Sequence, residues 1–125
     1  PLDAVVEIPG SKSITNRALA AAALADGVSI LTGALLADDT RLMIDALRAL
    51  GIAITLDAAT FTLEVTGCDG HLPADEADLF CGNSGTTLRF LTALCAAVYG
   101  TYRLDGTARM RQRPVGSLVE ALRSR

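Results

Sequence analysis

The stretch DDTRLMIDALRALGIAITLDAATFTLEVT, residues 38–66, decides the fold class of this 125-residue chain. Its first half predicts a helix, because apolar residues recur at the helical period at Leu42, Met43, Ala46, Leu47 and Leu50. Asp38, Asp39 and Thr40 offer N-cap oxygens before this helix, and Gly51 ends it. We therefore expect a helix with one apolar face in this half of the stretch.

Strands and a second helix are expected on both sides of this element. Residues 52–56 and 60–66 predict two strands joined by a short turn, a β-hairpin. Upstream, the alanine-rich residues 13–25 predict a helix, and residues 28–32 predict a strand. Residues 4–8 predict a further short strand at the start. The resulting order, β-α-β-α-β-β, indicates the α/β (α+β) class.

The remainder of the chain begins the same order again. Residues 67–78 predict an irregular loop, and a short strand is expected at residues 78–81. A helix over residues 86–98, a strand over 101–105 and a helix over 115–122 follow. Because strand, helix and strand recur here in that order, we expect a second copy of the unit to begin near residue 78 and to be cut off.

Charge is distributed unevenly along the chain. Residues 1–78 carry twelve acidic and four basic side chains, whereas residues 79–125 carry two acidic and seven basic ones. Aromatic residues make up 4% of the chain, and Lys12 is its sole lysine, so neither a stacking platform nor a lysine stripe for nucleic acid is present. The late arginines instead predict a compact anionic ligand.

Composition excludes several other classes of protein. The chain is 50% hydrophobic, which is enough for a buried core, but no apolar run reaches the ~18 residues of a membrane span. The start shows no basic-then-apolar signal pattern, so a cytoplasmic location is expected. Cys68, Cys81 and Cys95 lack metal-ligand spacing and are interpreted as reduced thiols, and His71 is the single histidine. These residues therefore predict no metal site built from cysteine or histidine side chains.

The first candidate anion site is Pro9-Gly10-Ser11-Lys12-Ser13, followed by Arg17. A glycine-serine loop at a helix start offers free backbone N–H groups and the positive end of the helix dipole. Ser13 and Arg17 are four residues apart, so they share a helix face with Cβ atoms ~6 Å apart. Lys12, Ser13 and Arg17 are predicted to form an anion cradle. The alternative is a capped helix with solvated charges.

The second candidate is GNSGTTLR, residues 82–89, where two glycines precede a helix and let its backbone approach a ligand closely. On the alternative interpretation, Asn83 and Ser84 cap the helix and Arg89 lies on a solvated face.

The third candidate is RMRQRP, residues 109–114. Pro114 favours extended backbone before it, and in an extended segment Arg109, Arg111 and Arg113 would lie on one side. Such arginines repel one another unless an anion neutralises them, and guanidinium groups grip phosphate and carboxylate in bidentate fashion. A soluble basic loop is the alternative.

Together these motifs resemble the 5-enolpyruvylshikimate-3-phosphate synthase family. The resemblance rests on PGSKSITNRAL at 9–19, GNSGTTLR at 82–89 and RMRQRPVGSLVEAL at 109–122, and it extends in order over essentially the whole chain. Phe90 stands where some members have Pro. The family transfers the enolpyruvyl group of phosphoenolpyruvate to the 5-hydroxyl of shikimate 3-phosphate, releases phosphate, and uses no metal or organic cofactor.

The resemblance also implies roles for single residues. Lys12 would contact both substrates, and Ser13 and Arg17 would bind shikimate 3-phosphate. The backbone of Gly85 and the side chain of Arg113 would bind phosphoenolpyruvate, with a Cβ at position 85 projecting into that pocket. Second-tier candidates near the same cleft are Asn83 and Arg89. The resemblance assigns no ligand contact to Arg109 or Arg111, and it places the proton-accepting aspartate outside this chain.

The resemblance further implies an inside-out barrel in which each of two domains repeats the β-α-β-α-β-β unit three times. On this basis residues 1–9 are expected to belong to the far domain. Residues 10–125 would form part of the N-terminal domain, with a first unit ending near residue 66 and a truncated second unit. The complete protein is expected to be a monomer. Two alternatives stay open: a non-catalytic anion-binding domain of the same fold, and a related transferase that acts on a UDP-sugar.

Overall fold

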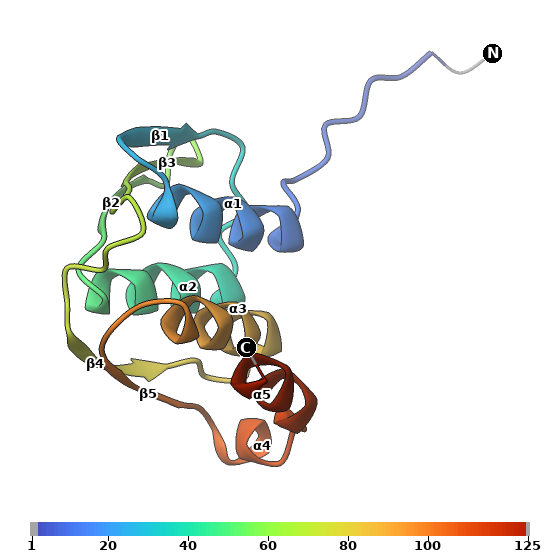
Figure 1. The fold of residues 1–125 in the computed structure, drawn as a ribbon. Helices are drawn as coiled ribbons and strands as arrows, with labels where there is room; N and C mark the ends of the chain where they lie inside the picture. Colours follow the sequence, from blue (N-terminus) through green and yellow to red (C-terminus); the bar gives the residue numbers. More distant parts are fainter. Residues whose placement is uncertain (1–2, 125) are drawn as a thin grey trace.

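The computed structural model describes residues 3–124, and from residue 12 on its elements follow the expected order, with one additional short helix at residues 108–111 (Figure 1). They are α1 (Lys12–Leu24), β1 (Val28–Leu31), α2 (Asp38–Ala49), β2 (Ala53–Asp57), β3 (Thr62–Thr66), β4 (Glu76–Phe80), α3 (Gly85–Ala96), β5 (Thr101–Asp105), α4 (Ala108–Arg111) and α5 (Gly116–Arg123). This mixture of helices and strands confirms the α/β class.

Two separate sheets enclose the first three helices. The predicted hairpin is present as β2 and β3, and β1 pairs antiparallel with the other side of β3, which gives the order β1-β3-β2. The second sheet is the parallel pair β4-β5, whose crossover connection is α3. Figure 1 shows α1, α2 and α3 stacked between these sheets. The later residues of α1 and most of α3 are thereby packed in the interior, whereas the first turn of α1 stays exposed.

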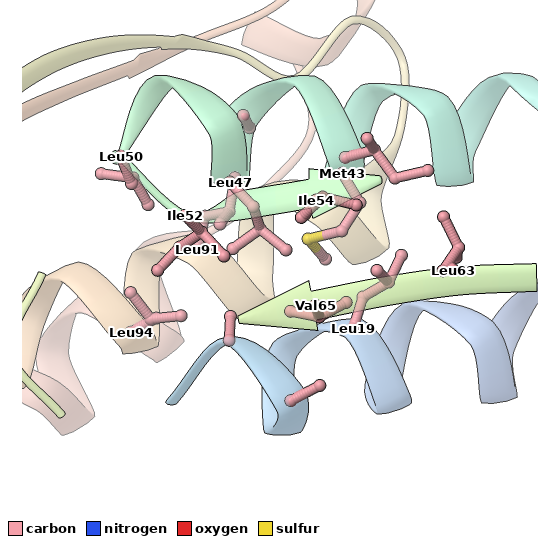
Figure 2. Close-up of a cluster of buried hydrophobic side chains, with 14 of the residues drawn as sticks. Leu19, Met43, Leu47, Leu50, Ile52, Ile54, Leu63, Val65, Leu91 and Leu94 are labelled. Atoms are coloured by element: carbon pink, nitrogen blue, oxygen red, sulfur yellow. The ribbon is translucent and has the colours of Figure 1, made fainter. Parts of the chain in front are cut away.

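The core lies where α1, α2 and α3 meet the hairpin (Figure 2). Leu19, Met43 and Leu47 are fully buried, as are Leu63, Val65 and Leu91. The helical period predicted for α2 is confirmed at Met43, Ala46 and Leu47 and at the C-cap residue Leu50, all of which are buried. Burial of these side chains supplies the main driving force that fixes the three helices relative to one another.

The prediction of a strand at residues 4–8 is wrong for this structure. Residues 3–9 have extended backbone with no ladder partner, and Figure 1 shows them leading away from the folded body. Val5, Val6 and Ile8 have exposed fractions of 96%, 77% and 84%. β-branched residues favour a strand only where a neighbouring strand accepts their backbone hydrogen bonds, and no described strand does so here. The assignment of residues 1–9 to a far domain stays a prediction, as does the division into units near residues 66 and 78.

Two details of the helices also differ from expectation. The N-cap residue of α2 is Ala37, not one of the three residues after it; the Thr40 hydroxyl accepts a hydrogen bond from the Ala37 N–H at 2.8 Å. Residues 109–113 are not extended as a whole, because Ala108–Arg111 form the short helix α4 behind an N-cap at Thr107. The Thr107 hydroxyl accepts from the Met110 N–H at 3.3 Å, which stabilises this turn.

Candidate anion-binding site

The first motif forms a fixed loop followed by the start of α1. The Ser11 side chain caps the helix by accepting from the Ile14 N–H at 3.4 Å. The Thr15 hydroxyl donates to the Ser11 carbonyl at 2.8 Å and accepts from the Leu35 N–H at 3.1 Å. Gly10 lies so close to the following loop that a Cβ there would collide with the Gly33 carbonyl oxygen. These contacts tie the loop to residues 33–35 and leave the next two side chains of the motif exposed.

A cavity of about 280 Å³ opens between α1 and α3. Ser13 and Arg17 line it from α1, so the predicted sharing of one helix face is confirmed. Thr86, Arg89 and Phe90 line it from α3. Arg17 forms no ion pair with any described residue, and its guanidinium is therefore available to an anion. Two guanidinium groups and two hydroxyl groups around one opening suit a phosphate group.

Sequence reasoning missed Thr86 and Phe90 as residues of this cavity. The signal was present for Thr86, because it precedes Arg89 by three residues on the same helix and so shares its face. Arg89 itself is held by backbone carbonyls: it donates to Gly85 O at 3.3 Å and to Pro114 O at 3.1 Å. It therefore links α3 to the segment before α5 and also presents positive charge to the cavity.

Lys12 points toward α2. Its Nζ lies 3.0 Å from Oδ2 of Asp39, and the two side chains have exposed fractions of 49% and 26%. Asp39 was expected to cap α2 and was not expected at the site. The ion pair brings the first motif into contact with the start of the second helix.

The second motif ends β4 and begins α3 with a buried polar cap. Ser84 is the N-cap residue; its Oγ accepts from the Thr87 N–H at 3.2 Å and donates to the Thr87 Oγ1 at 2.8 Å. The Thr87 hydroxyl in turn donates to the Asp39 carbonyl at 3.2 Å. The capping interpretation thus holds for Ser84, whereas Asn83 is exposed and does not cap the helix. Gly85 is buried as the first residue of α3.

Arg113 packs directly against Gly85. A Cβ on Gly85 would lie 2.6 Å from Nη2 and 2.8 Å from Cζ of Arg113, so the glycine is what allows the guanidinium to lie there. The Arg113 Nη1 also donates to the Asn83 carbonyl at 3.2 Å. The first side chain that a methyl group at position 85 would meet is therefore Arg113, the residue that was expected to share a pocket with Gly85.

The other two arginines of the third motif have different surroundings. Arg111 forms a bidentate pair with Asp105, with Nε–Oδ1 and Nη2–Oδ2 distances of 2.8 and 2.7 Å. The Arg111 guanidinium, together with the Gly106 N–H, holds the pKa of the Asp105 carboxyl well below its usual range. Arg109 is exposed and forms no ion pair with the described residues. Arg111 therefore fixes the turn that delivers Arg113, and the three arginines do not form one surface.

The described residues contain no group of three or more His, Cys, Asp or Glu side chains that could hold a metal ion. Within the same part of the chain, no helix has the length and apolar character needed to cross a membrane.

Known proteins match this chain over its whole length. Residues 1–125 fit the profile of the family described as EPSP synthase (3-phosphoshikimate 1-carboxyvinyltransferase). A 3-phosphoshikimate 1-carboxyvinyltransferase of Rhizobium etli (strain ATCC 51251 / DSM 11541 / JCM 21823 / NBRC 15573 / CFN 42) is 58% identical over 123 residues, and one of Nostoc punctiforme (strain ATCC 29133 / PCC 73102) is 53% identical over 122. Each alignment covers 98% of this chain and 29% of the relative.

The fold of this chain is also similar to that of a solved structure. EPSP synthase from Acinetobacter baumannii superposes with a TM-score of 0.83 at 27% sequence identity, over 95% of this chain and 27% of that one. The chain thus spans less than a third of the length of the proteins it matches.

Proposed function

Because this chain belongs to the EPSP synthase family, we propose that it forms one wall of the active site of a 3-phosphoshikimate 1-carboxyvinyltransferase. In the proposed reaction the 5-hydroxyl of shikimate 3-phosphate gives up its proton to the aspartate expected outside this chain and its oxygen adds to C2 of phosphoenolpyruvate, while C3 gains a proton. The tetrahedral intermediate then loses a proton from C3 as the bond from C2 to the phosphate oxygen breaks and phosphate leaves. Positioning and proton transfer carry this reaction, without a metal or an organic cofactor.

The cavity between α1 and α3 is the single observation that carries the proposal. It presents Ser13 and Arg17 beside Arg89, at a place with hydroxyl donors and fixed positive charge. We assign Ser13 and Arg17 to the phosphate of shikimate 3-phosphate. Arg89 also contributes positive charge, but its two hydrogen bonds to backbone carbonyls make it chiefly part of the wall.

The phosphoenolpyruvate side of the site lies around the start of α3. Gly85 and Arg113 are in direct contact there, and we assign the Gly85 backbone and the Arg113 guanidinium to phosphoenolpyruvate. Asn83 acts through its carbonyl, which accepts a hydrogen bond from Arg113. Lys12 is assigned to both substrates, since an ammonium group is a compact charge that can donate to two anions at once.

Two alternative functions make different predictions. A non-catalytic domain of the same fold would bind the anions without turnover, and a UDP-sugar transferase would accept a different hydroxyl substrate. The names of the relatives favour the shikimate 3-phosphate reaction over the UDP-sugar reaction. The proton-accepting aspartate, expected beyond these 125 residues, decides between catalysis and binding alone.

The test uses the full-length protein that carries this chain. Phosphate release is measured with phosphoenolpyruvate and either shikimate 3-phosphate or a UDP-sugar, in the wild type, Arg17→Ala and the exposed-arginine control Arg123→Ala. We expect turnover with shikimate 3-phosphate, a raised KM for it in Arg17→Ala, and wild-type constants in Arg123→Ala. Turnover with the UDP-sugar instead, or binding without turnover, would replace the proposal by the corresponding alternative.

The cytoplasmic location and the monomeric state of the complete protein stay predictions. Cell fractionation and size-exclusion chromatography measure them.

A further inference from the structure

We propose that Asp39 is a positioning residue that holds the Lys12 ammonium between the two substrate-binding motifs. The inference rests on the proposed function and adds to it a residue that the sequence motifs did not assign to the site. Its basis is the 3.0 Å ion pair between Lys12 Nζ and Asp39 Oδ2.

Lys12 needs such a partner because its own helix does not favour it. It is the first residue of α1, where the positive end of the helix dipole repels a cation, and the first turn of α1 holds no acidic residue. Its side chain is long and flexible, so without a partner the ammonium would sample many rotamers in solvent. An ammonium that must meet two substrates has to be confined to one region before they bind.

Asp39 is suited to this task because its own position is fixed. It lies in the first turn of α2, where the helix dipole favours a carboxylate. The neighbouring Thr40 hydroxyl donates to the Leu35 carbonyl at 2.7 Å and accepts from the Ala37 N–H, which fixes the entry into this helix. The Asp39 carbonyl accepts from the buried Thr87 hydroxyl of α3 at 3.2 Å.

Asp39 therefore connects the two motifs through a single residue. Its side chain contacts Lys12 of the first motif, and its backbone contacts Thr87, which is bonded to the N-cap Ser84 of the second. Asp38, the preceding residue, has the same charge but is exposed and forms no ion pair with the described residues. It supplies a matched control.

The direction of the kinetic effect separates positioning from simple electrostatics. A carboxylate near an anion site repels the substrates, so if Asp39 acts only as a charge, Asp39→Asn should lower KM for both anionic substrates. If Asp39 positions Lys12, the same change should raise both KM values, because the ammonium is no longer confined. A partly exposed ion pair contributes little to stability, so neither effect should follow from unfolding.

The kinetic arm compares Asp39→Asn, Asp39→Glu and Asp38→Asn in the full-length protein. We expect Asp39→Asn to raise KM for both substrates about 10-fold with a nearly unchanged unfolding midpoint. Asp39→Glu should recover part of this loss, and Asp38→Asn should leave KM unchanged or lower. In a Lys12→Ala background Asp39→Asn should add less than about twofold, because the two residues act as a unit. A lowered KM in Asp39→Asn, or additive effects in the double variant, would overturn the proposal.

A second arm does not depend on catalysis. In the full-length protein with lysine labelled with ¹⁵N and ¹³C, the Lys12 side-chain signals are those that disappear from the NMR spectra of Lys12→Ala. We expect the Lys12 Cε and Nζ signals to shift and to become more mobile in Asp39→Asn but not in Asp38→Asn. Identical Lys12 signals in the wild type and Asp39→Asn would refute the positioning role. Absence of turnover in the wild-type protein would instead refute the proposed function. The NMR measurement would still show whether Asp39 positions Lys12.

Discussion

Replacement of Gly85 by alanine is expected to act through Arg113. The added Cβ would lie 2.6 Å from Nη2, 2.8 Å from Cζ and 3.0 Å from Nη1 of that guanidinium. Ordinary van der Waals contact begins at 3.4 Å, so the guanidinium must withdraw by 0.8 Å, the difference between 3.4 and 2.6 Å. The obstructing atoms are at the end of a flexible side chain, and we therefore expect Arg113 to move while α3 stays in place.

The cost should fall on phosphoenolpyruvate. A withdrawn Arg113 loses its 3.2 Å hydrogen bond to the Asn83 carbonyl and is displaced from the anion that it is proposed to bind. A hydrogen bond to a charged group contributes about 1.5–3 kcal/mol. Loss of the hydrogen bond from Arg113 to phosphoenolpyruvate therefore predicts a rise in KM for this substrate of about 10- to 150-fold. The KM for shikimate 3-phosphate should change much less, because Ser13 and Arg17 lie on the other helix.

Steady-state kinetics of the full-length protein test this reasoning. Gly116→Ala is the matched control, because a Cβ at this helix start meets nothing within 4 Å. The decisive comparison adds Gly85→Ala to Arg113→Ala: if residue 85 acts through the guanidinium, the second change should have almost no further effect on KM. Full additivity of the two changes, or an unchanged KM for phosphoenolpyruvate in Gly85→Ala alone, would refute the mechanism.

Three further predictions follow from the site and the fold. Lys12→Ala in the full-length protein should lower kcat/KM at least about 10-fold. Lys12→Arg should also be impaired, because a planar guanidinium group does not replace the compact charge of an ammonium group. Wild-type kinetics in both variants would mean that the loop only caps the helix. The 125-residue chain mixed with both substrates should release no phosphate above background, and sustained release would show that the residues here suffice. Because the pKa of Asp105 is lowered in the folded state, its pair with Arg111 stabilises the fold above the unfolded pKa near 4 and is lost as pH falls below it. Asp105→Asn should thus lower the urea midpoint at pH 7, with a difference from wild type that shrinks from about pH 4 downward; a constant difference would contradict this.

The predictions that succeeded depend on local periodicity. The buried face of α2 follows from the spacing of Met43 and Leu47, and the hairpin follows from two strand-forming stretches with a short turn between them. Ser13 and Arg17 were placed on one face by their spacing alone, and both line the cavity. In each case the information lies within a few residues of sequence, so no knowledge of distant partners was required.

The predictions that failed depended on partners elsewhere in space. Val5 and Val6 favour a strand, but a strand needs a neighbour for its backbone groups and no described residue supplies one. Pro114 restricts the residue before it, and Arg113 is indeed outside α4; the error was to extend that restriction to the preceding residues. The Thr107 cap was the signal that could have corrected it.

Asp39 illustrates what sequence reasoning could not reach. The two aspartates at the start of α2 are equivalent in sequence, and only the packing of α1 against α2 determines that Asp39 and not Asp38 meets Lys12. The family resemblance assigned Gly85 and Arg113 to one pocket, but local sequence patterns could not show that they touch. The contact joins residues 28 positions apart through the turn that the Asp105–Arg111 pair stabilises.

The two helix starts at the cavity are capped by neutral groups. A carboxylate in the first turn usually stabilises a helix by about 0.3–1 kcal/mol. α2 uses this with Asp38 and Asp39, whereas the other four helices in the described part of the chain have no acidic residue in their first turns, among them α1 and α3, which border the cavity. Both are capped instead by neutral hydroxyls, those of Ser11 and Ser84. The two helices thus satisfy backbone groups at their starts without a carboxylate of their own. Asp39, which approaches the start of α1 from α2, pairs with Lys12 and not with Arg17 or Arg89, so the charge of these two arginines stays available to an anionic substrate.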